Sequence, residues 1–339
     1  MKRSGIALAN ITDMRTLTTA FHAAARGKRG RDDVEAFRDG LYQELKTLRQ
    51  EILAGTWSPR AMRAFRIRDP KPRLIHAPMF RDRVLHHAVM AHVGPALDRG
   101  LVFDTYACRA GKGTLAAVQR AQSHAARYPW FAQLDVRGYF ANIDHDILLA
   151  QLAGRLKNRR LLDLLERIVR AHASGPGCGL PIGTLTSQHF ANFYLAELDR
   201  LMLETCRVRG FVRYMDDLVF WADDRAAARA ALDAACDFLS ARLRLTAKEP
   251  ARLGPSEGGL NFLGFRILPN RLLLSRRRKR RYSELRAGAE QTFLASEMDA
   301  AGLQSAYARA LSLTIHADAA AWRREQLRRK PVEPVLEAI

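Results

Sequence analysis

One short stretch limits what this chain can fold into more than any other: FVRYMDDLVFWADD, residues 211–224. Apolar and aromatic residues on both sides of Asp216 and Asp217 are typical of two strands joined by a tight turn. At the tip of such a hairpin both side chains can reach solvent, although neighbours within a strand face opposite ways. Two carboxylates held this close repel each other unless a cation lies between them, so a metal-binding hairpin is one interpretation of the stretch.

An Asp-Asp pair alone also fits an ordinary polar turn, and a third carboxylate nearby favours a catalytic site instead. In WFAQLDVRGYFANIDHDIL, residues 130–148, a short apolar strand ends in Asp135. If this strand lies beside the hairpin, Asp135, Asp216 and Asp217 converge on one point. Such a cluster fits two-metal phosphoryl transfer, in which one ion activates a hydroxyl and the other neutralises charge on a triphosphate. Two Mg²⁺ ions are the expected cofactor, with Mn²⁺ as a substitute.

Around these motifs, helical and strand-like patterns alternate. Apolar residues at spacings of three and four predict a helix over residues 32–54. Alternating short runs predict a basic hairpin over residues 65–78, FRIRDPKPRLIHAP, and a second hairpin over residues 258–274. Further helices are predicted over residues 80–97, after GKGT at 111–114, from about Thr186, over residues 224–243, and after Ser275. Together these patterns indicate an α+β fold with helices on one side of a sheet.

The charge of the chain indicates a polyanionic partner. Lys and Arg number 55 and Asp and Glu 35, which gives a formal net charge of +20 over 339 residues. Such an excess favours nucleic acid, although an Arg-rich proteome would give the same balance. One basic run is either a solvated helix face or a contact with a duplex backbone. It consists of Arg276, Arg277, Arg278, Lys279, Arg280 and Arg281.

Two other kinds of protein are not favoured by this sequence. Its four cysteines lie far apart without a CxxC pair, so neither a structural zinc site nor a disulfide framework is indicated. No stretch approaches the roughly 20 apolar residues of a membrane span. The apolar run near the N-terminus is too short for a secretory signal. We therefore expect a cytoplasmic protein that has no membrane partner.

Four motifs, in order along the chain, resemble those of reverse transcriptases. RYMDDLVFW resembles the catalytic hairpin of that family, QLDVRGYFANIDH its first carboxylate motif, GLPIGTLTSQHFANFYL its template and nucleotide loop with the following helix, and GLNFLGFRI its primer-grip hairpin. The similarity implies an RNA-directed DNA polymerase with a right-hand architecture. The implied parts are an N-terminal helical extension (1–55), fingers (56–130, with part of 145–190), a palm with an antiparallel sheet (131–270) and a short helical thumb (271–339).

The resemblance also implies which residues hold the metal ions. Asp135 and Asp216 match the principal metal ligands, Asp217 matches an additional catalytic carboxylate, and the backbone of Val136 completes the expected metal site.

Four other aspartates match nothing catalytic in the family. Asp144 and Asp146 follow the first carboxylate motif, and Asp223 and Asp224 follow the hairpin. Aspartate is a common N-cap, so all four are expected to begin helices.

Contacts with the incoming nucleotide are implied for a further set of residues. Lys71 and Arg73 match basic fingers positions that hold the triphosphate. Phe140 matches the bulky side chain that meets a ribose 2′-hydroxyl, although an ordinary core aromatic fits this position too. The remaining nucleotide contacts are Ile182 and Gly183 in the nucleotide loop and Lys248, a looser match near the leaving pyrophosphate. Gln188 and the basic run at 276–281 are the implied nucleic-acid contacts.

Within the family, the loop LPIG indicates one subgroup. Many members have Gln where this chain has Ile182, and with TSQ at 186–188, RDPKPRLI and TYACRAGKGT the chain most resembles the reverse transcriptases of diversity-generating retroelements. In that subgroup the enzyme copies a template RNA with errors at adenines, and the cDNA replaces a variable repeat. Loss of an amide beside the nascent base pair should weaken discrimination that depends on hydrogen bonds.

The resemblance to this subgroup also implies partners. These are dNTPs, a structured template RNA, an RNA/DNA hybrid and a small basic accessory protein. Two alternatives remain open: a group II intron-like or phage-defence reverse transcriptase, and a catalytically silent RNA-binding protein on a polymerase scaffold. Paired repeats in the flanking DNA that differ at adenines would distinguish the first alternative, and primer extension would distinguish the second.

Overall fold

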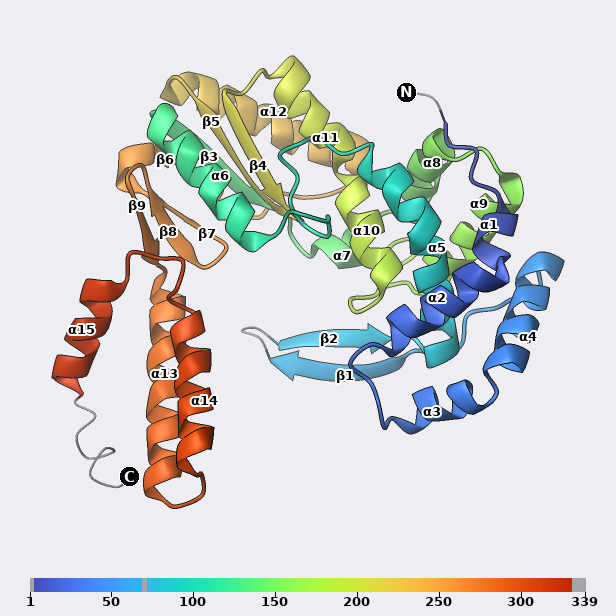
Figure 1. The fold of residues 1–339 in the computed structure, drawn as a ribbon. Helices are drawn as coiled ribbons and strands as arrows, with labels where there is room; N and C mark the ends of the chain where they lie inside the picture. Colours follow the sequence, from blue (N-terminus) through green and yellow to red (C-terminus); the bar gives the residue numbers. More distant parts are fainter. Residues whose placement is uncertain (1–2, 69–71, 331–339) are drawn as a thin grey trace.

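The structure is a computed structural model that describes residues 3–68 and 72–330. Its strands form antiparallel sheets of two, four and three strands, and helices pack around them (Figure 1). The α+β class predicted from the sequence is therefore confirmed. Lys71 lies outside the described residues.

The N-terminal part of the chain is helical. It consists of α1 (Leu8–Thr12), α2 (Met14–Ala25), α3 (Asp32–Asp39) and α4 (Leu41–Ala54). The single helix predicted over residues 32–54 is wrong, because the backbone leaves the helical conformation at Gly40, a residue with low helix propensity. The rings of Phe21, Phe37 and Phe80 pack together at centroid distances of 5.3 to 5.9 Å. These rings fasten the N-terminal helices to the helix that starts at Phe80.

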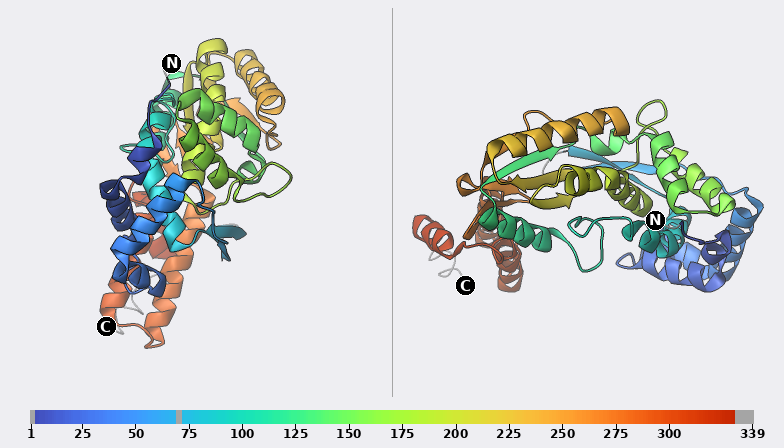
Figure 2. Two further views of the ribbon diagram at one scale, coloured as in Figure 1. Left: turned by 90° about the vertical axis from the view of Figure 1, so that its right-hand side faces the viewer. Right: turned by 90° about the horizontal axis from the view of Figure 1, so that it is seen from above.

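The basic hairpin predicted after these helices is confirmed. Strands β1 (Arg63–Arg68) and β2 (Pro72–Ala77) pair antiparallel, with Phe65 opposite Ile75. The hairpin projects from the rest of the molecule (Figure 2, left). Two helices follow in the chain, α5 (Phe80–Asp98) and α6 (Thr114–Arg127).

A four-stranded antiparallel sheet lies at the centre of the molecule. Its strands are β3 (Trp130–Asp135), β4 (Gly210–Tyr214), β5 (Asp217–Ala222) and β6 (Arg252–Pro255), in the order β4-β5-β3-β6. Helix α12 (Arg225–Leu243) covers one face and α6 covers the other (Figure 2, right). The expectation of helices on one side is therefore wrong.

The reason for this second layer is that the central strands are apolar on both faces, and both faces must be removed from water. One core contains Leu134, Leu218 and Phe220 together with residues of α12, and the other contains Phe131, Val219 and Trp221 together with residues of α6.

The segment between β3 and β4 is mostly helical. Its helices are α7 (Tyr139–Asn142), α8 (His145–Arg155), α9 (Arg159–Arg170), α10 (Leu185–Tyr194) and α11 (Ala196–Arg200), followed by a π-helical turn (Leu201–Thr205). The long helix predicted from about Thr186 begins at Leu185 but is interrupted at Leu195, whose ψ of 4° is not helical. The side chain of Thr184 caps the start of α10 by accepting a bond from the Ser187 N–H.

The C-terminal part contains a small sheet and a helical layer. Its strands are β7 (Leu260–Phe262), β8 (Phe265–Leu268) and β9 (Arg271–Leu274), and its helices are α13 (Arg276–Leu294), α14 (Ala300–Ser312) and α15 (Ala320–Arg329). The second predicted hairpin is thus a three-stranded meander. Ser275 caps α13 by accepting a bond from the Arg278 N–H. Within the described ranges, no helix has the length and apolar character needed to cross a membrane.

Candidate active site

The adjacent aspartates lie where two central strands meet in a tight turn. Tyr214 at the end of β4 pairs with Asp217 at the start of β5, which leaves Met215 and Asp216 as the two turn residues. Met215 has a φ of +58°, in the left-handed region that side chains rarely adopt. A turn with a positive φ at its first central residue matches the twist of the two strands, and glycine is the usual residue there. The turn therefore depends on surrounding contacts to hold Met215.

Those contacts come from a fully buried ion pair under the turn. Arg213 donates through Nε and Nη2 to the two carboxylate oxygens of Asp199, each at 2.6 Å, and both side chains are 0% exposed. The Nη1 atom of Arg213 donates to the Met215 carbonyl at 2.9 Å and to the side chain of Asn192 at 2.9 Å. The last N–H donates to the Asn192 carbonyl at 2.9 Å, so all five donors of the guanidinium are used.

The third carboxylate reaches the same place from the neighbouring strand. Asp135, the last residue of β3, is the direct partner of Asp217 in the antiparallel register, so the two side chains leave the sheet on one face. The adjacency of strand and hairpin predicted from the sequence is thus confirmed. Asp135, Asp216 and Asp217 lie together at one end of the sheet.

The surroundings of Asp216 and Asp217 oppose the ionisation of these two carboxylates. Burial raises the pKa of Asp216 to about 6, and the charge of Asp135 adds to this shift. Burial also raises the pKa of Asp217 to about 7, with the charges of Asp135 and Asp216 acting in the same direction, while a hydrogen bond from Gln133 opposes the rise. A site that resists negative charge in the absence of cations is one that a bound cation would stabilise.

The donor set at this end of the sheet fits Mg²⁺, although no group of three or more His, Cys, Asp or Glu side chains in the described part of the chain is arranged as a metal cage. Mg²⁺ needs only one or two protein carboxylates, because substrate phosphates and water complete its octahedron. A cationic group already lies beside one carboxylate, since Lys248 Nζ contacts Asp135 Oδ2 at 3.1 Å. Val136 is buried and pairs with Ala247 in an isolated bridge, which fixes its backbone next to Asp135.

Two of the nucleotide contacts predicted from the sequence lie on a loop that is tied to the β1–β2 hairpin. The carbonyl of Ile182 accepts a bond from the His76 N–H at 2.8 Å. Gly183 has a φ of +121°, and a Cβ there would come within 2.7 Å of Cγ2 of Ile75. This close approach requires glycine, so the position is fixed by packing between the loop and β2.

The other predicted contacts are placed as follows. Arg73 is exposed on β2, and its positive charge partly opposes the rise in the pKa of Asp216 that burial causes. Phe140 is half-buried on α7 and meets Tyr139 edge to face. Gln188 is exposed on α10. Lys248 adjoins Asp135, as described above.

The basic run at the start of α13 is not uniform. Arg276, Arg277, Arg280 and Arg281 are exposed. Arg278 instead is half-buried, with its guanidinium carbon 3.9 Å from the ring centre of Phe265, and burial lowers its pKa. Lys279 is also half-buried, with Nζ 5.6 Å from the ring centre of Trp322. The contact of Arg278 joins α13 to β8, the contact of Lys279 joins α13 to α15, and both leave these two cations less free for a ligand.

Two of the four non-catalytic aspartates begin helices as predicted. Asp144 accepts from the N–H groups of Asp146 and Ile147 at the start of α8, and Asp224 accepts from the N–H of Ala227 at the start of α12.

The prediction is wrong for the other two. Asp146 lies in the first turn of α8 and pairs with Arg170 at 2.7 Å, and Asp223 pairs with Arg209 at 2.9 Å. Each helix has one N-cap position, so only one aspartate of each close pair can cap.

Sequence reasoning missed two residues that hold the candidate site. Gln133 donates through Nε2 both to Asp217 Oδ1 at 3.0 Å and to the Asn261 carbonyl at 3.1 Å, which links the carboxylates to β7. Arg213 was visible only as one more basic residue in a basic chain. A charged residue inside an otherwise apolar strand, FVRY, was the available signal, because such a residue must find a buried partner.

Comparison with known proteins matches this arrangement of motifs to one family. The pattern of the reverse transcriptase (RNA-dependent DNA polymerase) family matches residues 67–267, which is more than half of the chain and includes all three carboxylates. The chain belongs to the reverse transcriptase family.

Two named proteins that are similar in sequence to this chain are distant relatives. The group II intron-encoded protein LtrA of Lactococcus lactis subsp. cremoris is 25% identical over 176 residues, 49% of this chain and 29% of LtrA. Protein YkfC of Escherichia coli strain K12 is 26% identical over 179 residues, 48% of this chain and 46% of YkfC. The chain thus spans less than half the length of both relatives.

Among solved structures, apo telomerase from Candida tropicalis, truncated from the C-terminal domain, is similar with a TM-score of 0.47 and 10% identity. The similarity covers 63% of this chain and 55% of the telomerase chain.

The buried ion pair yields a prediction about stability. Arg213→Met should lower the free energy of unfolding by about 3–5 kcal/mol, because it leaves the Asp199 carboxylate buried without a partner. Arg213→Met combined with Asp199→Leu should be more stable than Arg213→Met alone, since no charge is then left buried. Urea unfolding of the variants measures both effects. Arg209→Ala, which breaks the exposed pair with Asp223, is the control and should cost no more than about 1 kcal/mol. A double variant less stable than Arg213→Met would contradict this account.

The raised pKa values yield a second prediction. An ordinary aspartate has a pKa of about 3.9, so between about pH 4 and pH 7 the folded chain holds more protons on Asp216 and Asp217 than the unfolded chain does. Their contribution to stability therefore falls as pH rises through this range. Without divalent ions, the melting temperature of the wild type should fall between about pH 5 and pH 7.5 relative to that of an Asp216→Asn/Asp217→Asn variant. Parallel pH profiles of the two proteins would refute the prediction.

Proposed function

We propose that this chain is an RNA-directed DNA polymerase that makes cDNA by two-metal nucleotidyl transfer. The observation that supports this most is the direct pairing of Asp135 with Asp217 beside the turn that carries Asp216, in a member of the reverse transcriptase family. When bound, Mg²⁺ ions would activate the primer hydroxyl and neutralise charge on the triphosphate. Asp135, Asp216 and Asp217, with the backbone of Val136, are the groups proposed to hold them.

The remaining residues of the proposed site would bind and orient substrate. Arg73, an exposed arginine of β2 whose charge acts on Asp216, is proposed to hold the triphosphate together with Lys71. Lys248, now paired with Asp135, has a second anion to bind when the triphosphate arrives, and we assign it to the leaving pyrophosphate. Phe140 is proposed as the side chain that meets the ribose.

A right-hand division of the chain accompanies this proposal. The β1–β2 hairpin belongs to the proposed fingers (56–130, with part of 145–190), the four-stranded sheet to the palm (131–270), and α13 to α15 to the thumb (271–339), after a helical extension (1–55). In support, the β1–β2 hairpin and the α13–α14 pair both extend below the central sheet in Figure 1. The exposed arginines of α13 and the side chain of Gln188 are proposed to contact the template and the hybrid.

The proposed metal site yields a direct test. Asp216→Asn keeps the size of the side chain but removes a charge that would bind Mg²⁺, so Mg²⁺-dependent primer extension should fall about a thousandfold or more. Affinity for RNA should change by no more than about twofold, because binding depends mainly on the basic residues. Extension on a primed RNA template and filter binding measure the two effects.

The control for this test is Asp223→Asn, which removes the same charge from an exposed aspartate a few residues away. It should extend primers at the wild-type rate. Extension that survives Asp216→Asn would refute the assigned metal site. A wild-type protein that binds RNA but never extends a primer would favour the alternative of a catalytically silent RNA-binding protein.

We further propose that this polymerase is error-prone at template adenines and serves mutagenic retrohoming in a diversity-generating retroelement. The supporting observation is Ile182, whose carbonyl binds the His76 N–H and whose aliphatic side chain offers no hydrogen bond. A structured template RNA and a small basic accessory protein are the partners that this role implies. The likeness to LtrA keeps a group II intron-like role as the alternative, and flanking DNA without paired repeats that differ at adenines would favour it.

The proposed low fidelity rests on one side chain and can be tested there. Ile182→Gln should lower misincorporation opposite template adenine, because an amide restores hydrogen-bonding capacity beside the nascent pair. Ile182→Leu, which stays aliphatic, is the matched control and should keep the wild-type error rate. Sequencing of cDNA from the three proteins on one template decides the matter, and equal adenine error rates for Ile182→Gln and the wild type would overturn the proposal.

A further inference from the structure

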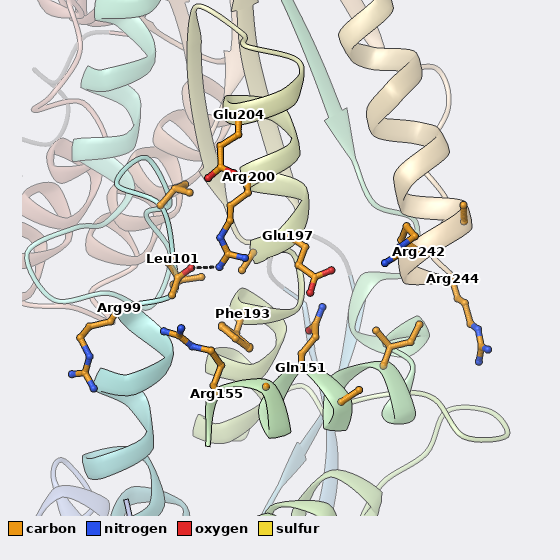
Figure 3. A pocket seen from close by; sticks show the side chains of 17 residues that line it. Arg99, Leu101, Gln151, Arg155, Phe193, Glu197, Arg200, Glu204, Arg242 and Arg244 are labelled. Carbon is orange, nitrogen blue, oxygen red and sulfur yellow. Dashed lines mark hydrogen bonds between the residues drawn. The ribbon is translucent and has the colours of Figure 1, made fainter. Parts of the chain in front are cut away.

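A large basic cavity lies away from the candidate active site. It has a volume of about 960 Å³, is open to solvent, and is lined by the end of α5 and the loop after it, α8, the end of α10 with α11, and the end of α12 (Figure 3). Among the described residues that line it there is none from β3, β4 or β5. Its charged lining side chains are Arg99, Arg155, Arg200, Arg242, Arg244, Glu197 and Glu204, a formal excess of three positive charges.

Two of these arginines are held in place from one side only. Arg155 donates through Nη2 to the Ala96 carbonyl at 3.0 Å, and Arg200 donates through Nη2 to the Gly100 carbonyl at 2.7 Å. Arg155 extends toward the end of α5, and Arg200 extends toward the loop after it (Figure 3). A guanidinium has five N–H donors, so each retains several that these bonds do not use. Ordering a long side chain in advance lowers the entropic cost of binding a ligand.

The positive charge of the cavity is poorly compensated. Arg244 is paired with Asp144 at 2.7 Å, but Arg99, Arg155, Arg200 and Arg242 have no carboxylate within 4.0 Å in the described part of the chain. Burial lowers the pKa of Arg155, and the charges of Arg200 and Arg99 lower it further. The Nε atom of Arg155 is buried and has no hydrogen-bond partner in the described structure.

Capping of α5 explains only part of this cluster. Arginines at the C-terminus of a helix bind its free carbonyls and interact well with its dipole, which accounts for the bonds of Arg155 and Arg200. It does not explain why Arg242, from the last turn of α12, lines the same cavity. Glu197 and Glu204 line the cavity as well, yet neither approaches one of these arginines closely enough to pair with it.

We propose that this cavity binds a phosphodiester of folded RNA, at a place separate from the template and primer. Arginine is suited to phosphate because its planar fork donates two parallel hydrogen bonds to one group, and phosphate oxygens would satisfy the unused donors. RNA is the polyanion that a member of the reverse transcriptase family must bind. The choice of RNA as the ligand rests on the proposed function; the rest of the inference does not. A site remote from the carboxylates would hold the body of a structured RNA while its template strand is copied.

The test compares two variants that lose the same charge. Arg99→Ala/Arg242→Ala removes two exposed arginines of the cavity that make no side-chain hydrogen bond or ion pair with the described residues. Arg49→Ala/Arg225→Ala removes two exposed arginines of the same kind from α4 and α12, away from the cavity. Affinity is measured as a function of salt for a folded hairpin RNA, and extension is measured on a short oligo(rA)·oligo(dT) hybrid.

The cavity variant should bind the hairpin RNA about tenfold more weakly. Its negative slope of log affinity against log salt should become less steep by about 2. The control variant should keep more of the wild-type RNA affinity and more of the wild-type salt slope. The two variants should each extend the short hybrid at the wild-type rate. Equal RNA affinities and salt slopes for the two variants would overturn the proposal.

A second measurement covers a different occupant. Phenylglyoxal labels accessible arginines, and hairpin RNA should protect Arg99 and Arg242 in the wild type when labelling is read by mass spectrometry. Equal protection by poly-L-glutamate would overturn the proposal in favour of an acidic protein partner. Failure of the proposed function would give a different result: the wild type would then fail to extend the short hybrid, whatever its affinity for hairpin RNA.

Discussion

The ion pair between Arg213 and Asp199 is the interaction on which the candidate site depends. A buried pair contributes little or negatively to stability unless its geometry is good and every remaining donor is satisfied. Here all five guanidinium donors are used, and Asp199 also accepts from the hydroxyl of Thr105 at 2.9 Å. The pair connects β4 to α10, to α11 and to the loop before α6, and through the Met215 carbonyl it reaches the turn. A left-handed methionine can persist because this network fixes it from below.

The two faces of the central sheet therefore differ in how their charges are compensated. Side chains alternate along a strand, so Arg213 and Leu218 face the core on the α12 side while Tyr214 and Asp217 face the other way. On the first face the charges of Arg213 and Asp199 are paired and buried, which holds the backbone in place. On the second face Asp217 and its strand partner Asp135 are brought together without full compensation. The rigid face holds the carboxylates close despite their repulsion, and that repulsion is what a cation would relieve.

Sequence was sufficient for several features whose signal is local, although the local break at Gly40 was missed. The hairpin around Asp216, the strand that ends in Asp135 and the caps at Asp144 and Asp224 each follow from a few neighbouring residues. It failed where the outcome depends on distant partners. The second helical layer over the sheet, the break at Leu195 and the ion pairs of Asp146 and Asp223 are set by tertiary packing, which a single sequence pattern does not encode. Gln133 shows the limit well, because its contacts lie more than eighty residues away in the chain.

The same limit applies to charge. A net charge of +20 indicates a polyanionic partner but does not say which cations are free to bind it. In the run at 276–281, Arg278 is largely occupied by Phe265, although the run looks uniform in sequence. The cavity beside α5 is the converse case, since its arginines come from separate helices and form no run at all. What makes a cation available is the absence of a nearby carboxylate together with a direction in which its N–H groups point. Both are properties of the fold, so the strongest basic segment of a sequence need not be the strongest anion site of the protein.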